Sequence, residues 1–136
     1  MIIKVVLDTN ILISALWTPA GNASFIISLV LTDRIIPCID HYIMNEYLSV
    51  LSRPKLSFPQ DQTEELLTEI RDRGIFVTVP RSTDKMPDEM DRKFYDVAKF
   101  CKAFLVTGNL KHFPKDKMIM NPAKFIDMFM QKNKSP

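Results

Sequence analysis

Three acidic residues, Asp8, Glu46 and Asp91, stand where secondary structure alone does not require a carboxylate. Asp8 follows a hydrophobic run, Glu46 borders the apolar stripe of a predicted helix, and Asp91 opens another predicted helix. Carboxylates that approach within ~4–6 Å of one another cannot all ionise cheaply without a cation between them. Oxygen ligands without a histidine or cysteine cluster suit Mg²⁺ or Mn²⁺ rather than Zn²⁺. Such ions often activate water for phosphoryl chemistry, so these residues are candidate metal ligands and catalytic groups.

Each acid also has a purely structural explanation. Asp8 can cap the following helix, Glu46 can be a surface residue beside the core, and Asp91 is favourable in a first helical turn because of the helix dipole. The positions of the three acids taken together favour a ligand-binding or catalytic role over these structural explanations. Both Asp8 and the polar residues 107–109 follow buried strands, and open α/β sheets bind ligands at the carboxyl ends of their strands.

The elements that would position these acids alternate along the chain. Residues 2–7 are apolar without alternation, which predicts a parallel strand buried on both faces. We expect further strands at residues 35–39, 76–79, 104–107 and 118–120, and helices at 11–16, 22–33, 41–52, 61–73, 91–102 and 122–131. Asn22 is a predicted helix cap, and Asp61 with Glu64 forms a predicted capping pair. Residues 80–90 are polar and predict a mobile loop. This order predicts an α/β fold with a parallel sheet of about five strands and helices on both faces.

Length and composition describe an ordinary globular chain. With 136 residues, 46% hydrophobic and 25% charged, we expect one domain at residues 1–131 and a disordered tail at 132–136. No apolar run approaches the ~20 residues of a membrane span. The first strand leaves no room for a signal peptide, so a cytoplasmic location is expected. Cys38 and Cys101 have apolar neighbours and are predicted to be buried free thiols, although a disulfide between them is an open alternative.

The net charge of +2 conceals an asymmetry. Residues 1–90 contain 8 Lys+Arg and 12 Asp+Glu, a net charge of −4, whereas residues 91–136 contain 10 and 4, a net charge of +6. The lysines of interest are Lys93, Lys99, Lys102, Lys111, Lys115 and Lys117. A basic C-terminal third is typical of contact with a polyanion, and a solvated lysine-rich surface explains the charge equally well.

Four sequence motifs resemble those of one known family. They are the strand end at residues 6–10, the helix segment 45–51 around Glu46, Asp91-x-x-Phe94-x-x-x-Ala98, and the segment 105–113. In this order and spacing the chain resembles the PIN domains, metal-dependent ribonucleases best known as toxins of bacterial toxin–antitoxin pairs. The resemblance covers about residues 2–128. It implies a three-layer α/β/α sandwich, single-stranded RNA as substrate, Mg²⁺ or Mn²⁺ as cofactor, and a homodimer that a small antitoxin protein binds.

The resemblance also implies roles for individual residues. Asp8 would be the central metal ligand, Asp91 the second, and Glu46 a ligand or the base that orients water. Thr9, Asn10 and Thr107 would be their near neighbours. Many family members have a fourth acid where this chain has Asn109, whose side chain offers a second metal a neutral oxygen and no charge. Asp88 and Asp116 are the nearby acids that could compensate.

Other functions fit the residues less well. A phosphatase of the haloacid dehalogenase type needs a second acid two residues after the first, and Asn10 stands there. The chain lacks the G-x-G-x-x-G turn that a dinucleotide-binding site requires after its first strand. His41 and His112 are too few and too far apart in sequence for a zinc site, and His112 is expected to be structural. The remaining alternative is a catalytically weak or silent module that keeps the fold and binds RNA or a protein inhibitor; Asn109 is the residue that favours it.

Overall fold

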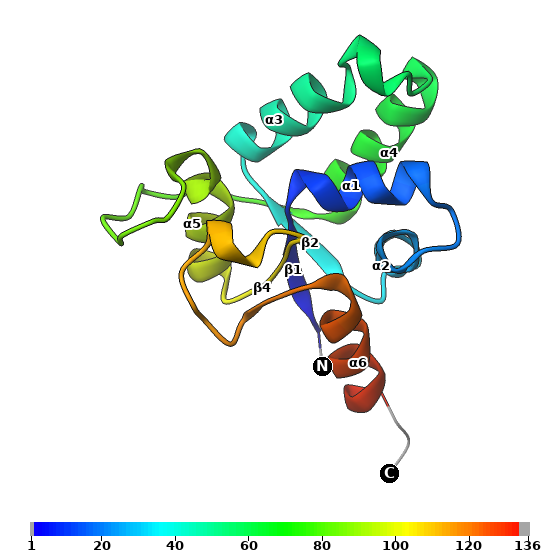
Figure 1. Cartoon of the computed structure of the whole chain (residues 1–136). Coiled ribbons are helices and arrows are strands. Elements are labelled where there is room, and N and C mark those ends of the chain that lie inside the picture. The colour runs from blue at the N-terminus through cyan, green and yellow to red at the C-terminus, as the bar shows by residue number, and fades with distance from the viewer. Residues whose placement is uncertain (1, 134–136) are drawn as a thin grey trace.

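The computed structural model describes residues 2–133. Its centre is a five-stranded sheet with the strand order β3-β2-β1-β4-β5. Figure 1 shows the central strands β2, β1 and β4. The strands are β1 (Lys4–Leu7), β2 (Ile36–Ile39), β3 (Ile75–Phe76), β4 (Phe104–Val106) and β5 (Ile119–Met120). All neighbouring strands are parallel, as predicted, although β3 is shorter than expected and begins one residue earlier. The central position of β1 explains why its apolar run does not alternate, since helices cover both of its faces.

Helices connect the strands and form the outer layers. They are α1 (Thr9–Trp17), α2 (Asn22–Leu31), α3 (His41–Leu51), α4 (Gln60–Arg73), α5 (Arg92–Cys101) and α6 (Pro122–Lys132). Figure 1 shows α5 on one side of the central strands and α2, α4 and α6 on the other. Helices α1 and α3 lie near the carboxyl end of β1. This arrangement confirms the predicted α/β/α sandwich.

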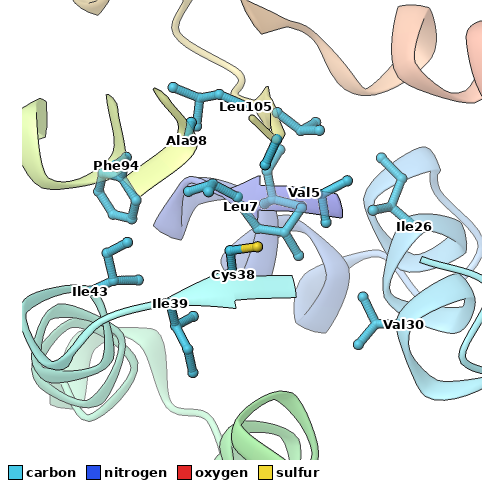
Figure 2. Packing of buried hydrophobic residues seen from close by; sticks show 14 of the residues in the cluster. Val5, Leu7, Ile26, Val30, Cys38, Ile39, Ile43, Phe94, Ala98 and Leu105 are labelled. Carbon is cyan, nitrogen blue, oxygen red and sulfur yellow. The ribbon is translucent and has the colours of Figure 1, made fainter. Parts of the chain in front are cut away.

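The hydrophobic core packs around β1 (Figure 2). Val5 and Leu7 of β1 are almost completely buried, between Leu105 of β4 and Ile39 of β2. From the helices, Ile26 and Val30 of α2, Ile43 of α3, and Phe94 and Ala98 of α5 enter the same cluster. Phe94 and Ala98 of the motif that begins at Asp91 therefore face the sheet, and this orientation of α5 also sets where Asp91 lies.

Two predicted helix caps are wrong. Gly21 occupies the N-cap position of α2, and Asn22 is the first helical residue because Gly21 already has the extended backbone of a cap. The α4 helix begins one residue earlier than expected, so Asp61 lies inside its first turn. Glu64 instead accepts a hydrogen bond from Gln60 at 2.8 Å. These differences shift helix ends by one residue and leave the architecture unchanged.

The irregular segment before α5 is anchored to that helix. Arg92 donates hydrogen bonds to the carbonyl oxygens of Ser82 at 3.0 Å and Asp84 at 2.7 Å. Asp96 accepts a hydrogen bond from the backbone N–H of Ser82 at 3.0 Å. These contacts hold residues 80–90, which the sequence predicts to be a mobile loop, against α5. They also set where the acidic residues at the start of α5 lie.

Three further expectations concern the cysteines, the C-terminus and the membrane. Cys38 and Cys101 are buried free thiols, as predicted, and burial raises the pKa of Cys38 to about 12. Helix α6 continues through Lys132, and residues 134–136 of the predicted tail lie outside the described residues. Within residues 2–133, no single helix is long and apolar enough to cross a membrane; by length and composition only the bent pair α1 and α2 together would qualify.

Candidate active site

The candidate site is built on the carboxyl ends of β1 and β4. These strands pair in the register Leu7 with Val106, so the residues that follow them, Asp8 and Thr107, lie side by side. Thr107 donates a hydrogen bond from Oγ1 to Asp8 Oδ2 at 2.7 Å. The Asp8 side chain makes no capping hydrogen bond to α1, and the residue is only 6% exposed. The helix-cap explanation therefore does not account for this carboxylate.

Asn10 and Thr9 link this strand end to its neighbours. Asn10 Oδ1 accepts a hydrogen bond from the backbone N–H of Gly108 at 3.1 Å, and its amide nitrogen lies 3.4 Å from Asp8 Oδ2. Thr9 Oγ1 donates to Glu46 Oε2 at 2.5 Å. The small polar residues after β1 thus contact both Asp8 and Glu46, which are 38 positions apart in the sequence.

A buried tyrosine positions Glu46. Tyr47, the next residue in α3, donates its hydroxyl to the carbonyl oxygen of Leu7 at 2.5 Å, which fixes α3 over the end of β1. Glu46 Oε1 also forms an ion pair with Lys93 Nζ at 2.8 Å. In the sequence, Tyr47 stands out only as a neighbour of Glu46 in the motif 45–51, and Lys93 only as one of the basic residues of the C-terminal third. For Tyr47 a signal existed, because a buried phenol requires a hydrogen-bond partner.

The second part of the site surrounds Asp91. Asp91 ends the 3₁₀ turn Glu89–Asp91 and is the N-cap residue of α5. Its Oδ2 lies 3.0 Å from His112 Nδ1, and Asp88 Oδ2 lies 3.8 Å from the same nitrogen. One ligand atom from each of these three residues lies within 4.8 Å of the other two. Two carboxylates and an imidazole at this spacing are a donor set that fits a divalent cation.

Comparison with known proteins gives the family. Residues 4–111 match the sequence profile of the PIN domain. A protein of Methanocaldococcus jannaschii, described as uncharacterized, is 31% identical to this chain over 110 residues, which are 79% of this chain and 71% of the relative. The chain belongs to the PIN domain family. PIN domains are generally nucleases and typically use divalent metals, so the family agrees with the acidic edge of this sheet.

The acids of this PIN domain influence one another. Burial raises the pKa of Asp8 from 3.8 to about 6, and the charges of Asp91 and Glu46 add to this effect while the Thr107 hydroxyl opposes it. Burial also raises the pKa of Asp91; Asp88 and Glu46 contribute, and His112 opposes. Repulsion among the carboxylates indicates that they face a common region. A bound cation would relieve it, because it favours the ionised forms.

The PIN domain does not bring every predicted residue to one point. Asp8 and Glu46 lie outside the 4.8 Å donor set of Asp88, Asp91 and His112. Asn109 is exposed, and within residues 2–133 its recorded polar contact is a backbone N–H that donates to Thr107 Oγ1 at 2.9 Å.

Of the two acids offered as compensation, only Asp88 joins the site. Asp116 pairs with Lys99 at 3.3 Å and accepts a hydrogen bond from the backbone N–H of Met118 at 2.8 Å. His112, which the sequence analysis considered structural, contacts the acids directly. Its only sequence signal was its place in the motif segment 105–113, and the family match ends one residue before it.

Proposed function

We propose that this PIN domain is a metal-dependent endoribonuclease that hydrolyses the phosphodiester bonds of single-stranded RNA. The observation that carries the proposal is the buried Asp8 at the carboxyl end of β1, whose pKa burial and the charges of Asp91 and Glu46 raise to about 6, together with the donor set of Asp88, Asp91 and His112. Buried acids that repel one another destabilise the fold, and a bound cation would offset this repulsion. Such groups are found mainly at functional sites, which favours a catalytic role for them.

The acids divide into two roles. Asp8, Asp91, Asp88 and His112 would hold the metal, since their side chains offer oxygen and imidazole donors. Glu46 would orient the attacking water and accept its proton, because Thr9 and Lys93 fix both of its carboxylate oxygens. In the reaction the water oxygen bonds to phosphorus, one P–O ester bond breaks, and the leaving oxygen gains a proton. When bound, the metal supplies Lewis acidity and lowers the pKa of water.

The donor set favours Mn²⁺ over Mg²⁺. The sequence predicts an all-oxygen site, for which either ion is suitable. His112 adds an imidazole nitrogen, and imidazole suits transition metals better than it suits Mg²⁺, which prefers oxygen ligands and water.

The surface charge supports a nucleic-acid substrate. Four exposed lysines, Lys102, Lys111, Lys115 and Lys117, form no ion pair within residues 2–133. They lie on or after α5, in the same part of the chain as Asp91 and His112. Lysines placed in this way bind phosphates through charge, and the affinity falls with salt concentration.

The test is cleavage of a labelled single-stranded RNA by the purified protein with Mg²⁺, Mn²⁺ or EDTA. We expect cleavage with either ion, faster with Mn²⁺, and none in EDTA. Asp8→Asn should abolish cleavage, and the matched control Asp72→Asn, an exposed carboxylate on α4, should not. Undiminished cleavage in EDTA, or by the Asp8→Asn protein, would overturn the proposal. Cleavage assays with single-stranded DNA and with duplex RNA of the same nucleotide sequence test whether the substrate is single-stranded RNA.

We further propose that this nuclease is the toxin of a toxin–antitoxin pair, forms a homodimer and is bound by a small antitoxin protein. The support is its likeness to PIN-domain toxins. Induced expression in a bacterial host should stop growth, and the Asp8→Asn variant should not. Light scattering of the purified protein tests the dimer. Unimpaired growth with cleavage-competent protein would leave the nuclease proposal standing and remove the toxin role.

A second candidate, a PIN domain that binds RNA without cleaving it, is favoured by two observations. Asn109 stands where the resemblance to PIN domains implies a fourth acid, and the ammonium of Lys93 already contacts Glu46. RNA binding with no cleavage under any metal would select this function.

A further inference from the structure

A cavity of about 670 Å³ adjoins the candidate active site. Its lining includes Pro87, Leu110, Phe113 and Ile119. Pro87 immediately precedes Asp88, and Lys111, another lining residue, immediately precedes His112. Two lining residues are therefore direct chain neighbours of members of the donor set of Asp88, Asp91 and His112.

The cavity joins an apolar surface to positive charge. Lys111 and Lys115 line it and are exposed, with no ion pair among residues 2–133. The acid in its lining, Asp116, is held by Lys99 and by the backbone N–H of Met118, which lower the pKa of its carboxyl group. Since Asp116 already has these partners, the charge that the cavity offers to a ligand is that of the two lysines.

Nucleotides have the chemistry that this surface matches. A base presents two flat apolar faces, and the phosphates on either side of it are anionic. Apolar side chains that pack against the base and lysines that contact the phosphates bind nucleotides with little dependence on sequence. An acidic peptide would use the lysines and leave the apolar wall formed by Leu110 and Ile119 without a partner.

We propose that this cavity is a nucleotide subsite. It receives the base of the nucleotide next to the scissile phosphate, with Leu110 and Ile119 against the base and Lys111 and Lys115 against the flanking phosphates. This inference rests on the proposed function for its substrate class and adds the surface that positions the RNA strand. The lysines would raise affinity, and the apolar wall would hold the strand so that one phosphodiester faces the acids.

The test observes the cavity directly, without catalysis. Protein with ¹³C-labelled isoleucine and leucine methyl groups is titrated in EDTA with adenosine 5′-monophosphate and uridine 5′-monophosphate. Both should shift the methyl signals of Ile119 and Leu110. Ribose 5-phosphate, which lacks the base, should not shift them. Titration with hexaglutamate tests whether the cavity binds an acidic peptide instead. Dilution of the protein alone tests whether a second copy of the chain occupies the cavity.

Two variants remove the contacts. Leu110 is 46% exposed, so Leu110→Ser should leave the fold intact, and Lys111→Gln removes one charge. Each should weaken nucleotide binding at least about fivefold. The controls are Leu48→Ser, on the exposed side of α3, and Lys124→Gln in α6; both should bind as the unmodified protein does.

Three outcomes would overturn the subsite: no methyl shift with either nucleotide, equal shifts with ribose 5-phosphate or hexaglutamate, or shifts that depend on protein concentration alone. Because no metal is present, failure here is distinct from failure of the nuclease. Cleavage of RNA without nucleotide shifts rejects the subsite alone, and nucleotide shifts without cleavage reject the nuclease and keep the binding site.

Discussion

The ammonium group of Lys93 lies 2.8 Å from Glu46 Oε1, so the chain itself supplies a cation to one of the three acids expected at the metal site. The Lys93 side chain is 18% exposed and also lies over the ring of Phe94. Lys93 comes from the first turn of α5, two residues after Asp91, and Glu46 comes from α3. The ion pair therefore connects the two helices that carry the predicted site residues, and it places a positive charge where a metal would also interact with the acids.

Lys93→Met should bind Mn²⁺ about fivefold more tightly, because a competing charge worth about 1 kcal/mol is removed. Without metal, the same variant should be less stable, since Glu46 then faces Asp8 and Asp91 without compensation. Calorimetric titration with Mn²⁺ and urea unfolding in EDTA measure the two effects. Lys99→Met, which breaks the pair with Asp116, is the control. Unchanged Mn²⁺ affinity would mean that the charge of Lys93 does not act on the metal site.

Asp8→Asn should stabilise the metal-free protein at neutral pH. The pKa of Asp8 is about 6 in the folded state against 3.8 as its ordinary value, so between about pH 4 and pH 6 the unfolded chain releases the proton first. The free energy of unfolding therefore falls as the pH rises through this window, by at most about 3 kcal/mol from this group. The variant should lack this fall. Urea unfolding in EDTA at several pH values measures it, and lower stability of the variant at every pH would instead show a structural role.

His112→Gln should reduce Mn²⁺ affinity more than Mg²⁺ affinity. The substitution removes the imidazole that lies 3.0 Å from Asp91, and Mn²⁺ uses nitrogen ligands more readily than Mg²⁺ does. Titration calorimetry with each ion gives the two losses. His41→Gln, a histidine on α3 stacked against Tyr42, is the matched control. Equal losses for both ions would place the metal away from His112.

Asn109→Asp should increase the stabilisation that Mn²⁺ confers. If Asn109 occupies the family's fourth acidic position, the new carboxylate adds a charged ligand, worth about 1–3 kcal/mol of binding in place of a neutral group. Without metal, the added charge should lower the melting temperature. Melting curves across a Mn²⁺ titration compare the two proteins. An identical metal-induced shift would mean that Asn109 lies outside the site.

Gly74→Ala should destabilise the fold by about 1–3 kcal/mol, a typical cost of overpacking. A Cβ atom at Gly74 would lie 2.6 Å from the Ile70 carbonyl oxygen and 2.7 Å from that of Pro37, and backbone atoms cannot move aside cheaply. Gly108→Ala is the control, because its Cβ would meet Asn10 at an ordinary 3.6 Å. Chemical unfolding of both variants tests whether the close contact between the end of α4 and β2 limits stability.

Local sequence was enough to predict the architecture. Apolar runs identified β1, β2, β4 and β5 because these strands are largely buried, and 3.6-residue periodicity identified the six helices. The predicted strand 76–79 shares only Phe76 with β3, whose two residues are exposed. Helix ends were less accurate, as Gly21 and Gln60 show, since neighbouring residues compete for the cap position. The motifs around Asp8, Glu46 and Asp91 were also sufficient to suggest the family that the comparisons then showed.

Only the tertiary structure decided which side chains meet. Thr107 bonds to Asp8 across 99 positions because β4 pairs with β1, and no local pattern specifies that strand order. Likewise, the positions of His112 beside Asp91 and of Lys93 on Glu46 depend on how the turn at residues 110–112 and the helix α5 pack at the sheet edge. The end of β1 at Asp8 could be predicted locally, because an apolar run gives way there to polar residues. The partners of Asp8 could not, because contacts between distant residues depend on the packing of the whole chain.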